Sequence, residues 1–313
     1  MSRVVVLGSV NVDATSYVAA FPRPGETIRS HDHRVALGGK GANQAIAAHR
    51  CGARVELVAR LGDDPAAEVA RAAFARFGLP VDAVETVPDR PTGIAQITVS
   101  ASGENTIVVT SGANADLGPA AVDAVRDLIA SADVVLTQGE LPVPTIDALA
   151  RACAAAGTRL VLNLAPPVAV DAATLAVADP LVVNAHEART LGLGVDLAPD
   201  ASAEAWRDVA VSAAGDLARS VVITLGALGA VAADGSGATV VHAPAVEAVD
   251  TTGAGDAATG ALVAMLAEGH PLGRALLAGA AAGAIAVQAH GTVDSYGTRD
   301  DVLALASRLE EDR

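Results

Sequence analysis

RVVVLGSVNVD, which spans Arg3 to Asp13, sets the architecture expected for the whole chain. The apolar run in its first half has the length and β-branched content of a buried strand, and Gly8 ends it. Asn11 and Asp13 follow at the carboxyl end of that strand, where open α/β sheets bind their ligands. Residues two apart in an extended segment face the same side, so an amide and a carboxylate suited to a diol would lie together. An Asx-turn that ends the strand explains the same residues about as well.

Short β-rich runs and alanine-rich stretches alternate along the rest of the chain, which is typical of a mostly parallel sheet with helices on both faces. We predict strands at residues 3–7, 55–59, 134–137, 159–162, 181–183 and 221–225. Helices are predicted at residues 41–50, 65–77, 119–130, 142–156 and 203–218, and three more begin near residues 255, 271 and 298. The sequence therefore indicates a Rossmann-type three-layer α/β sandwich.

Two regions interrupt this alternation. Residues 12–37 and 91–111 have the pattern of extended strands joined by turns, and neither contains a crossover helix. Strands without helices in an α/β chain predict a small separate β-sheet, which we expect to act as a lid. No linker or repeat divides the chain further, so we expect one domain over residues 1–313.

The composition argues against several classes of binding partner and of protein. The net charge of −15 argues against nucleic acid and against anionic membranes, because both need clustered Lys and Arg. Cys51 and Cys153 are the only cysteines, which argues against a disulfide framework. The longest apolar stretch, from Leu276 to Ala289, is shorter than the roughly 20 residues that cross a bilayer, and we expect a buried helix there. The first apolar run is too short for a signal peptide, so we expect a cytoplasmic protein.

The segment DTTGAGD, from Asp250 to Asp256, stands directly before an apolar helix. Its glycines allow a tight turn that points several backbone N–H groups at one spot, and the helix dipole adds positive potential there. Such an anion hole suits a phosphate, and Asp256 at its edge suits a general base toward an incoming hydroxyl. Taken alone, the segment fits equally well a simple turn in which Asp256 is the helix N-cap.

The segment GGKGANQ, from Gly38 to Gln44, also opens a helix. It is not a Walker loop, because a glycine follows Lys40 where Ser or Thr is required. We therefore expect Asn43 and the backbone of Gly39 and Lys40 to face a polyhydroxyl ligand. The alternative is a flexible connection with Lys40 in water, which the density of glycine disfavours.

Two weaker signals come later in the chain. TLGALG, from Thr224 to Gly229, has glycines that would let nucleotide phosphates approach the backbone, although a plain β-hairpin turn explains it too. Asn184 and Glu187 stand three apart at the start of a predicted helix, so they share a face on which metal-bound water would be oriented. Ordinary helix capping is the competing explanation. The histidines lack metal-ligand spacing.

Taken together and in this order, these segments resemble the ribokinase family of carbohydrate kinases, the phosphofructokinase-B type. The similarity runs from Val4 to about Ser295, and GGKGANQ and DTTGAGD are its most specific marks. PGET at Pro24, GDD at Gly62 and GAN at Gly112 add to it. The resemblance implies a ribokinase-like fold and a kinase that moves the ATP γ-phosphate to O5 of D-ribose. It also implies Mg²⁺ with the nucleotide, K⁺ as an activator, and a homodimer formed through the β lid.

The resemblance further implies a role for each matching residue. Asp256 is the expected base, beside an anion hole made by Gly253, Ala254 and Gly255. The expected sugar-binding set is Asn11, Asp13, Gly39, Lys40, Asn43, Glu140 and Asp256. The expected ATP-binding set is Asn184, Thr224, Gly226, Ala227, Gly229 and Gly255, with Glu187 near Mg²⁺ through water. The expected K⁺ set is Asp250, Thr252, Ala286, Ala289, Gly291 and Ser295.

Other functions stay open at this point. The same fold would serve another sugar or a nucleoside, although one Trp, two Tyr and three Phe offer little stacking surface for a base. A sugar-binding regulatory protein would keep the fold but would have no need of Asp256. A nicotinamide-dependent enzyme would need Gly-x-Gly-x-x-Gly after the first strand, and that pattern is absent.

Overall fold

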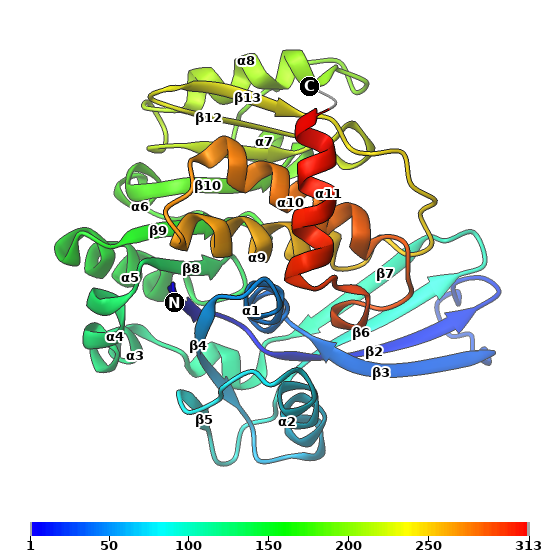
Figure 1. Ribbon diagram of the computed structural model, residues 1–313. Helices are drawn as coiled ribbons and strands as arrows, with labels where there is room; N and C mark the ends of the chain where they lie inside the picture. Colours follow the sequence, from blue (N-terminus) through cyan, green and yellow to red (C-terminus); the bar gives the residue numbers. More distant parts are fainter. Residues whose placement is uncertain (1, 312–313) are drawn as a thin grey trace.

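The computed structural model describes residues 2–311, which contain a large and a small β-sheet (Figure 1). The strand order of the large sheet is β13-β12-β11-β10-β9-β8-β1-β4-β5, and that of the small sheet is β3-β2-β6-β7. From β11 to β5 all neighbouring strands run parallel, whereas β12 and β13 extend the other end of the sheet in antiparallel fashion. The predicted mostly parallel sheet is therefore confirmed.

The bounds of the elements are as follows. The large sheet contains β1 (Arg3–Leu7), β4 (Arg54–Leu61), β5 (Val84–Thr86), β8 (Val134–Gln138), β9 (Arg159–Asn163), β10 (Ala178–Asn184), β11 (Val221–Thr224), β12 (Ala230–Asp234) and β13 (Gly237–Val241). The small sheet contains β2 (Asn11–Val18), β3 (Asp32–Gly38), β6 (Gly93–Ser100) and β7 (Asn105–Thr110). The helices are α1 (Lys40–Arg50), α2 (Pro65–Phe77), α3 (Pro119–Ala124), α4 (Arg126–Ser131), α5 (Val143–Ala156), α6 (Ala172–Val177), α7 (Ala185–Thr190), α8 (Ala203–Ala213), α9 (Ala254–Ala267), α10 (Leu272–Ala286) and α11 (Arg299–Glu311).

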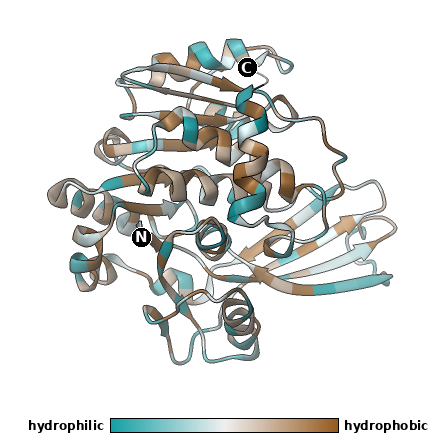
Figure 2. Cartoon of the chain, viewed as in Figure 1, coloured by the Kyte–Doolittle hydropathy of each residue, from teal (hydrophilic) through white to brown (hydrophobic). Residues whose placement is uncertain are grey.

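Helices cover both faces of the large sheet, because its strands are apolar on both sides. Val4 and Val6 of β1 belong to one hydrophobic core, and Val5 and Leu7 belong to the other. The first core is shared with α1, α2, α9, α10 and α11, and the second with α3, α4, α5 and α8. Figure 2 shows mostly brown strands at the centre of the sheet and a teal outer end on β3. This arrangement confirms the predicted three-layer sandwich.

The small sheet projects from the body of the molecule, as Figure 1 shows at the lower right. Its root is tied to the body by polar side chains. Asp64 caps α2 and also accepts hydrogen bonds from Thr92 N (2.8 Å) and Thr92 Oγ1 (2.7 Å), just before β6. Asn114 binds the backbone of Val10 through Val10 N and Val10 O, just before β2. The predicted separate sheet is confirmed, while its action as a lid stays a prediction.

The apolar stretch from Leu276 onward lies in α10, which is buried against α9. The prediction of a buried helix there is confirmed, although the helix begins at Leu272 and ends at Ala286. Within residues 2–311, no helix combines the length and apolar character that a bilayer crossing requires.

Some predicted elements differ from the structure at their ends. The helix predicted at residues 119–130 is interrupted at Val125, which ends α3 and precedes α4. The helix predicted at residues 203–218 ends at Ala213, because the chain turns at Gly215, whose φ of 92° is left-handed. The short edge strand β5 and the hairpin of β12 and β13 were not predicted. The sequence AVAAD of β12 is too rich in alanine to give a clear strand signal, whereas GATVV of β13 ends in three β-branched residues and did carry one.

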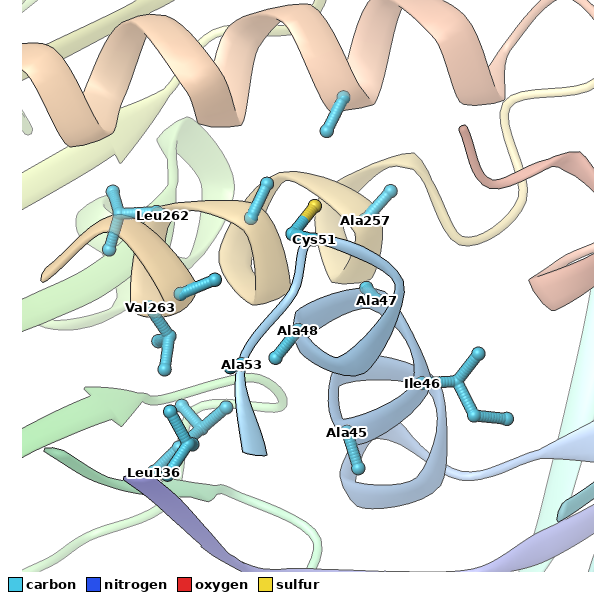
Figure 3. Close-up of a cluster of buried hydrophobic side chains, with 14 of the residues drawn as sticks. Ala45, Ile46, Ala47, Ala48, Cys51, Ala53, Leu136, Ala257, Leu262 and Val263 are labelled. Atoms are coloured by element: carbon cyan, nitrogen blue, oxygen red, sulfur yellow. The ribbon is translucent and has the colours of Figure 1, made fainter. Parts of the chain in front are cut away.

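Helices α1 and α9 pack against each other at unusually short range. Gly260 of α9 faces α1, where an added Cβ would lie 2.4 Å from Ala47 Cβ and 2.7 Å from Gln44 O. Figure 3 shows Ala47 and Ala48 of α1 next to the ribbon of α9 within the buried cluster. The small residues therefore let the two helix backbones approach, and this brings the first turn of α9 over the first turn of α1.

Replacing Gly260 by alanine should destabilise the fold by about 1–3 kcal/mol, because the new methyl group overlaps the backbone and Ala47 of α1. Gly283→Ala in α10 is the matched control, since its Cβ would meet nothing closer than 3.4 Å. That change should leave stability unchanged or raise it by roughly 0.5–1 kcal/mol through helix propensity. Urea unfolding measures both variants, and equal stabilities would contradict the packing constraint.

Candidate active site

The carboxyl ends of the central parallel strands place polar residues along one edge of the large sheet. Gln138 ends β8, Asn163 ends β9 and Asn184 ends β10. Ser9 follows β1 closely, and Thr224 ends β11. In open α/β sheets, this edge is where ligands bind. The first turns of α1 and α9 reach the same edge through contacts to these residues.

Asp256 is the residue on which the polar contacts of α1 and α9 converge. Asp256 Oδ2 accepts a hydrogen bond from Asn43 Nδ2 at 3.0 Å, and Asp256 Oδ1 accepts one from Gln44 Nε2 at 2.8 Å. Lys40 Nζ lies 4.0 Å from Oδ1, and the carboxylate of Asp256 raises the pKa of Lys40. The N-cap of α9 is Gly253, so the reading of Asp256 as the helix cap is wrong. Lys40 pairs with Asp256, so the reading of Lys40 as a water-exposed residue is wrong as well.

The first turn of α9 carries the predicted anion hole. Gly253 has a φ of 76°, a left-handed conformation that suits glycine, and it starts the helix two residues before Gly255. A Cβ on Gly255 would meet nothing within 4 Å, so a ligand has room to approach this backbone. Ala254 N donates to Thr251 O at 3.3 Å, a long bond that a stronger acceptor would replace. The N–H groups of a first helical turn have no intrahelical partner, which makes them donors for an anion.

The loop of residues 38–41 packs directly on the loop that follows β1. An added Cβ on Gly39, whose φ is 87°, would lie 2.6 Å from Asn11 N. An added Cβ on Gly41 would lie 2.4 Å from Ser9 N. These glycines are therefore required by close approach, which explains why GGKG precedes α1.

Glu140 joins the same two loops from the end of β8. Its Oε2 accepts hydrogen bonds from Ser9 Oγ at 2.5 Å and from Lys40 N at 3.0 Å. Ser9 Oγ in turn accepts a hydrogen bond from Gly41 N at 3.3 Å. The backbone N–H of Lys40 is thus engaged by Glu140, which leaves the Lys40 ammonium group as the part that faces Asp256.

Asn11 and Asp13 both lie in β2, so the Asx-turn interpretation is wrong. Asn11 Oδ1 accepts a hydrogen bond from Asn114 Nδ2 at 2.8 Å. The carboxyl group of Asp13 lies against Gly38, where an added Cβ would be 2.0 Å from Asp13 Oδ1. Burial, followed by the negative charges of Glu140 and Asp256, raises the pKa of Asp13 to about 7, although Lys40 opposes the shift.

The predicted ATP-binding residues lie at the ends of two neighbouring strands. Asn184 of β10 and Thr224 of β11 are direct register partners. Beyond them, Gly226 has a φ of 58° with open space at its Cβ position, whereas a Cβ on Gly229 would lie 2.0 Å from Val241 O. Thr224 to Gly229, Ala227 included, connects β11 to the antiparallel β12, so the hairpin interpretation is correct in geometry. The open backbone at Gly226 remains compatible with a nucleotide phosphate.

Asn184 and Glu187 form a capping box at the start of α7. Asn184 N donates to Glu187 Oε2 at 2.8 Å, and Glu187 N donates to Asn184 Oδ1 at 2.8 Å. The capping interpretation is therefore correct, and Glu187 Oε1 is not part of the box. Burial raises the pKa of Glu187, and the positive charge of Lys40 acts against this rise. Glu187 therefore lies close enough to the site to be influenced by the charge of Lys40.

The predicted K⁺-binding residues come from three segments that meet. Asp250 accepts hydrogen bonds from Thr252 N at 2.9 Å and Gly291 N at 3.0 Å. Burial is the largest single influence on the pKa of Asp250 and raises it, but the hydrogen bonds from Gly291 and Thr252 together with the charge of His290 bring the net pKa below its usual value. The backbone N–H groups of Val249 and Asp250 donate to Val287 O, between Ala286 and Ala289. Ser295 Oγ donates to Thr292 O at 2.8 Å in the turn after Gly291.

Five residues of the site had no role assigned from the sequence: Ser9, Gln44, Asn114, Gln138 and Asn163. Gln138 Nε2 donates to Gln44 Oε1 at 2.9 Å, and Gln44 Nε2 donates to Asn163 Oδ1 at 2.7 Å. A signal for two of them was present, because Gln138 and Asn163 are polar residues that end otherwise apolar strands. Such residues point to the ligand edge of a parallel sheet.

Comparison with known proteins identifies the family. The family model described as pfkB family carbohydrate kinase matches residues 1–299, and the chain therefore belongs to this family. The structure agrees with that assignment, since both diagnostic segments, GGKGANQ and DTTGAGD, meet at Asp256.

Within the family, the chain is similar to proteins named ribokinase. It is 36% identical to the ribokinase of Haemophilus influenzae over 302 residues, covering 95% of this chain and 96% of that protein. It is 33% identical to the ribokinase of Bacillus subtilis, covering 98% and 100% of the two chains. The solved structure of Arabidopsis thaliana ribokinase complexed with ribose and ATP superposes with a TM-score of 0.87 at 29% identity, covering 98% and 99%.

Because the pKa of Asp13 is raised to about 7, its carboxyl group should be protonated in most free molecules at pH 6 and ionised at pH 8. An ionised carboxylate accepts hydrogen bonds from sugar hydroxyls better than the acid does. We therefore expect kcat/KM for the sugar to fall by roughly tenfold for each pH unit below about 7.

The measurement is kcat/KM against pH, with Asp13→Asn as the control that cannot titrate. The variant should be weaker at pH 8 and should lose this part of the pH dependence. A wild-type profile that is flat between pH 6 and pH 8 would contradict the role of Asp13.

Proposed function

We propose that this protein is an ATP-dependent kinase that phosphorylates D-ribose at O5 to give ribose 5-phosphate. The observation that carries the proposal is the position of Asp256, which is held by Asn43 and Gln44 at the first turn of α9. A carboxylate beside a ready-made anion site combines a base with a phosphate-binding group. The similarity to ribokinases over nearly the whole chain supports ribose as the acceptor.

In the proposed reaction, Asp256 accepts the proton of the sugar hydroxyl as its oxygen attacks the γ-phosphorus. The new O–P bond forms while the bond from the γ-phosphorus to the bridging oxygen breaks, and that electron pair leaves with ADP. The backbone N–H groups at Gly253, Ala254 and Gly255 and the ammonium group of Lys40 offset the charge on the transferred phosphoryl group. Positioning and electrostatics therefore supply most of the rate enhancement.

Sugar binding is assigned to the polar cluster around Asp13 and Asn43. Asn43 is 5% exposed, and its Oδ1 is buried without a hydrogen-bond partner among the described atoms. Such an acceptor is costly unless a ligand supplies the donor, and a sugar hydroxyl is a suitable one. Lys40, Glu140 and Asn11 complete the polar wall on the side of β1 and β2.

Magnesium and potassium are the cofactors we assign to this reaction. Within residues 2–311, no cluster of three or more His, Cys, Asp or Glu side chains forms a metal cage. Mg²⁺ fits this donor set, because it is often held by one or two carboxylates together with nucleotide phosphates, and Glu187 would orient its water ligands. When bound, Mg²⁺ neutralises charge on the phosphates. K⁺ would be held by Asp250 and by backbone carbonyl groups near Ala286, Ala289, Gly291 and Ser295, with Thr252 beside them.

Cytoplasmic location stays an expectation from the sequence.

Replacing Asp256 by asparagine should lower kcat by roughly 10²–10⁴-fold, because the general base is lost, while ribose affinity should stay near the wild-type value. Asp147→Asn is the matched control, since Asp147 and Asp256 are both 7% exposed and Asp147 binds Thr174 and Asp171 instead. The measurement is coupled ADP release, with and without K⁺, together with calorimetric ribose binding.

A panel of ribose, fructose and adenosine in the same assay separates the acceptors. Faster turnover of another sugar or of the nucleoside would make that compound the preferred acceptor, while the protein would remain a kinase of the same family. Near-wild-type turnover by Asp256→Asn would remove the base assignment, and a lack of ADP release with every acceptor would favour a non-catalytic sugar-binding protein.

We also propose that two copies associate through the small sheet. β7 is an edge strand of this sheet, and all of its residues are exposed. Three successive apolar residues of β7 are exposed, namely Ile107 (52%), Val108 (64%) and Val109 (53%). Soluble proteins usually cover such an apolar edge. A second copy of the chain is the partner that the sequence resemblance implies.

Changing Ile107, Val108 and Val109 together to threonine should weaken the dimer at least about tenfold, because it removes apolar contact area while keeping β-branched side chains in the strand. Val211→Thr is the control, since Val211 is 51% exposed but lies on α8. Analytical ultracentrifugation measures the dissociation constants. A dimer unaffected by the triple change would rule out β7 as the contact.

A further inference from the structure

A chain of buried amide side chains runs from the sheet to the carboxylate of Asp256. Gln138 Nε2 donates to Gln44 Oε1 at 2.9 Å, and Gln44 Nε2 donates to Asp256 Oδ1 at 2.8 Å. Gln44 Nε2 also donates to Asn163 Oδ1 at 2.7 Å, and Asn163 Nδ2 donates to Val182 O at 3.0 Å. Gln44 and Gln138 are both 0% exposed, so neither can contact a substrate. Any effect of these two residues on the reaction must therefore be transmitted through Asp256.

The charge of Asp256 determines the direction of every hydrogen bond in this chain. An ionised carboxylate only accepts, so Gln44 must turn its NH₂ group toward Asp256. Gln44 Oε1 then faces Gln138, which must present its own NH₂ group. Asn163 must offer its oxygen to Gln44, and its NH₂ group is left for Val182 O. In this orientation each of the three amide NH₂ groups donates a hydrogen bond, while Gln138 Oε1 has no partner among the described atoms.

This arrangement leaves the two oxygens of Asp256 in different surroundings. Oδ1 is held by the fully buried Gln44, with Lys40 Nζ at 4.0 Å. Oδ2 is held by Asn43, a residue of the sugar-binding set. Gln44 thus prevents the carboxylate from rotating and keeps Oδ2 on the side of Asn43.

We propose that Gln44 is a positioning residue for the phosphoryl transfer, which fixes the orientation of the Asp256 carboxylate and is itself oriented by Gln138 and Asn163. The inference rests on the proposed function, because it concerns the base of that reaction. No contact of Gln44 with the sugar or the nucleotide is involved.

The test compares Gln44→Met with Gln44→Glu. Gln44→Met removes the donor while keeping the length of the side chain, so kcat at pH 7 should fall roughly 10- to 100-fold, the range expected for a hydrogen bond to a charged group. Without this donor the carboxylate of Asp256 can rotate, so the loss should fall on kcat, which contains the step in which Asp256 takes the proton. The KM for ribose should stay near the wild-type value, because the fully buried Gln44 does not contact the sugar.

Gln44→Glu distinguishes hydrogen-bond donation from shape. It preserves the size of the side chain but replaces the donating NH₂ group by a second carboxyl group, so kcat should fall as in Gln44→Met while the KM for ribose stays unchanged. A role of Gln44 in packing alone predicts that Gln44→Glu resembles the wild type more than Gln44→Met does. Gln138→Met should lower kcat to a smaller extent, because Gln44 keeps its donor but loses its orientation.

Thr145→Val is the matched control for the loss of a buried hydrogen bond. Thr145 is 0% exposed in α5 and donates to Leu117 O at 2.7 Å, outside the site. Thr145→Val should lower thermal stability without lowering kcat. If Asp256→Asn abolishes turnover but the Gln44 variants keep the wild-type kcat, the inference on Gln44 is overturned and the proposed function stands. If wild-type protein releases no ADP with any acceptor, both are overturned.

Discussion

The close contact between α1 and α9 is the constraint on which the active site depends. Gly260 allows the backbones to meet at Gln44 and Ala47, and this distance sets the position of the first turns of both helices. Asp256 comes from one of these turns, while Lys40, Asn43 and Gln44 come from the other. Neither helix alone contains a site. A larger residue in the contact would separate a base from the side chains that hold it.

The electrostatics of the site are local. The chain carries a net charge of −15, and the site itself holds Asp13, Glu140 and Asp256 around a single ammonium group, that of Lys40. Their mutual influence appears in the raised pKa of Asp13 and the raised pKa of Lys40. An anionic nucleotide must therefore rely on backbone N–H groups and bound cations rather than on the overall field. The glycine-rich turn at the start of α9 is the proposed source of those N–H groups, since the N–H groups of Lys40 and Gly41 at the start of α1 already donate to Glu140 and Ser9.

Much of this arrangement could be predicted from sequence, because the elements involved have strong local signals. The apolar strand β1, the proline-started helix α2 and the glycine segments before α1 and α9 were all placed correctly. The segments GGKGANQ and DTTGAGD also indicated Asp256. The amide chain through Gln44, Gln138 and Asn163 was not foreseen, because these residues are far apart in sequence and meet only through the strand order. β12 was missed because alanine carries little β propensity, whereas the signal of β13 lay in its Thr239, Val240 and Val241 and was overlooked.

The ties at the root of the small sheet have a consequence for any movement of that sheet. Asp64 fixes Thr92 before β6, and Asn114 fixes Val10 before β2. The same ends of β2 and β3 carry Asn11, Asp13 and Gly38, which lie at the proposed sugar site. Any swing of the sheet would therefore pivot at that proposed site. The far ends of the strands would move most, while Asn11 and Asp13 would hardly be displaced.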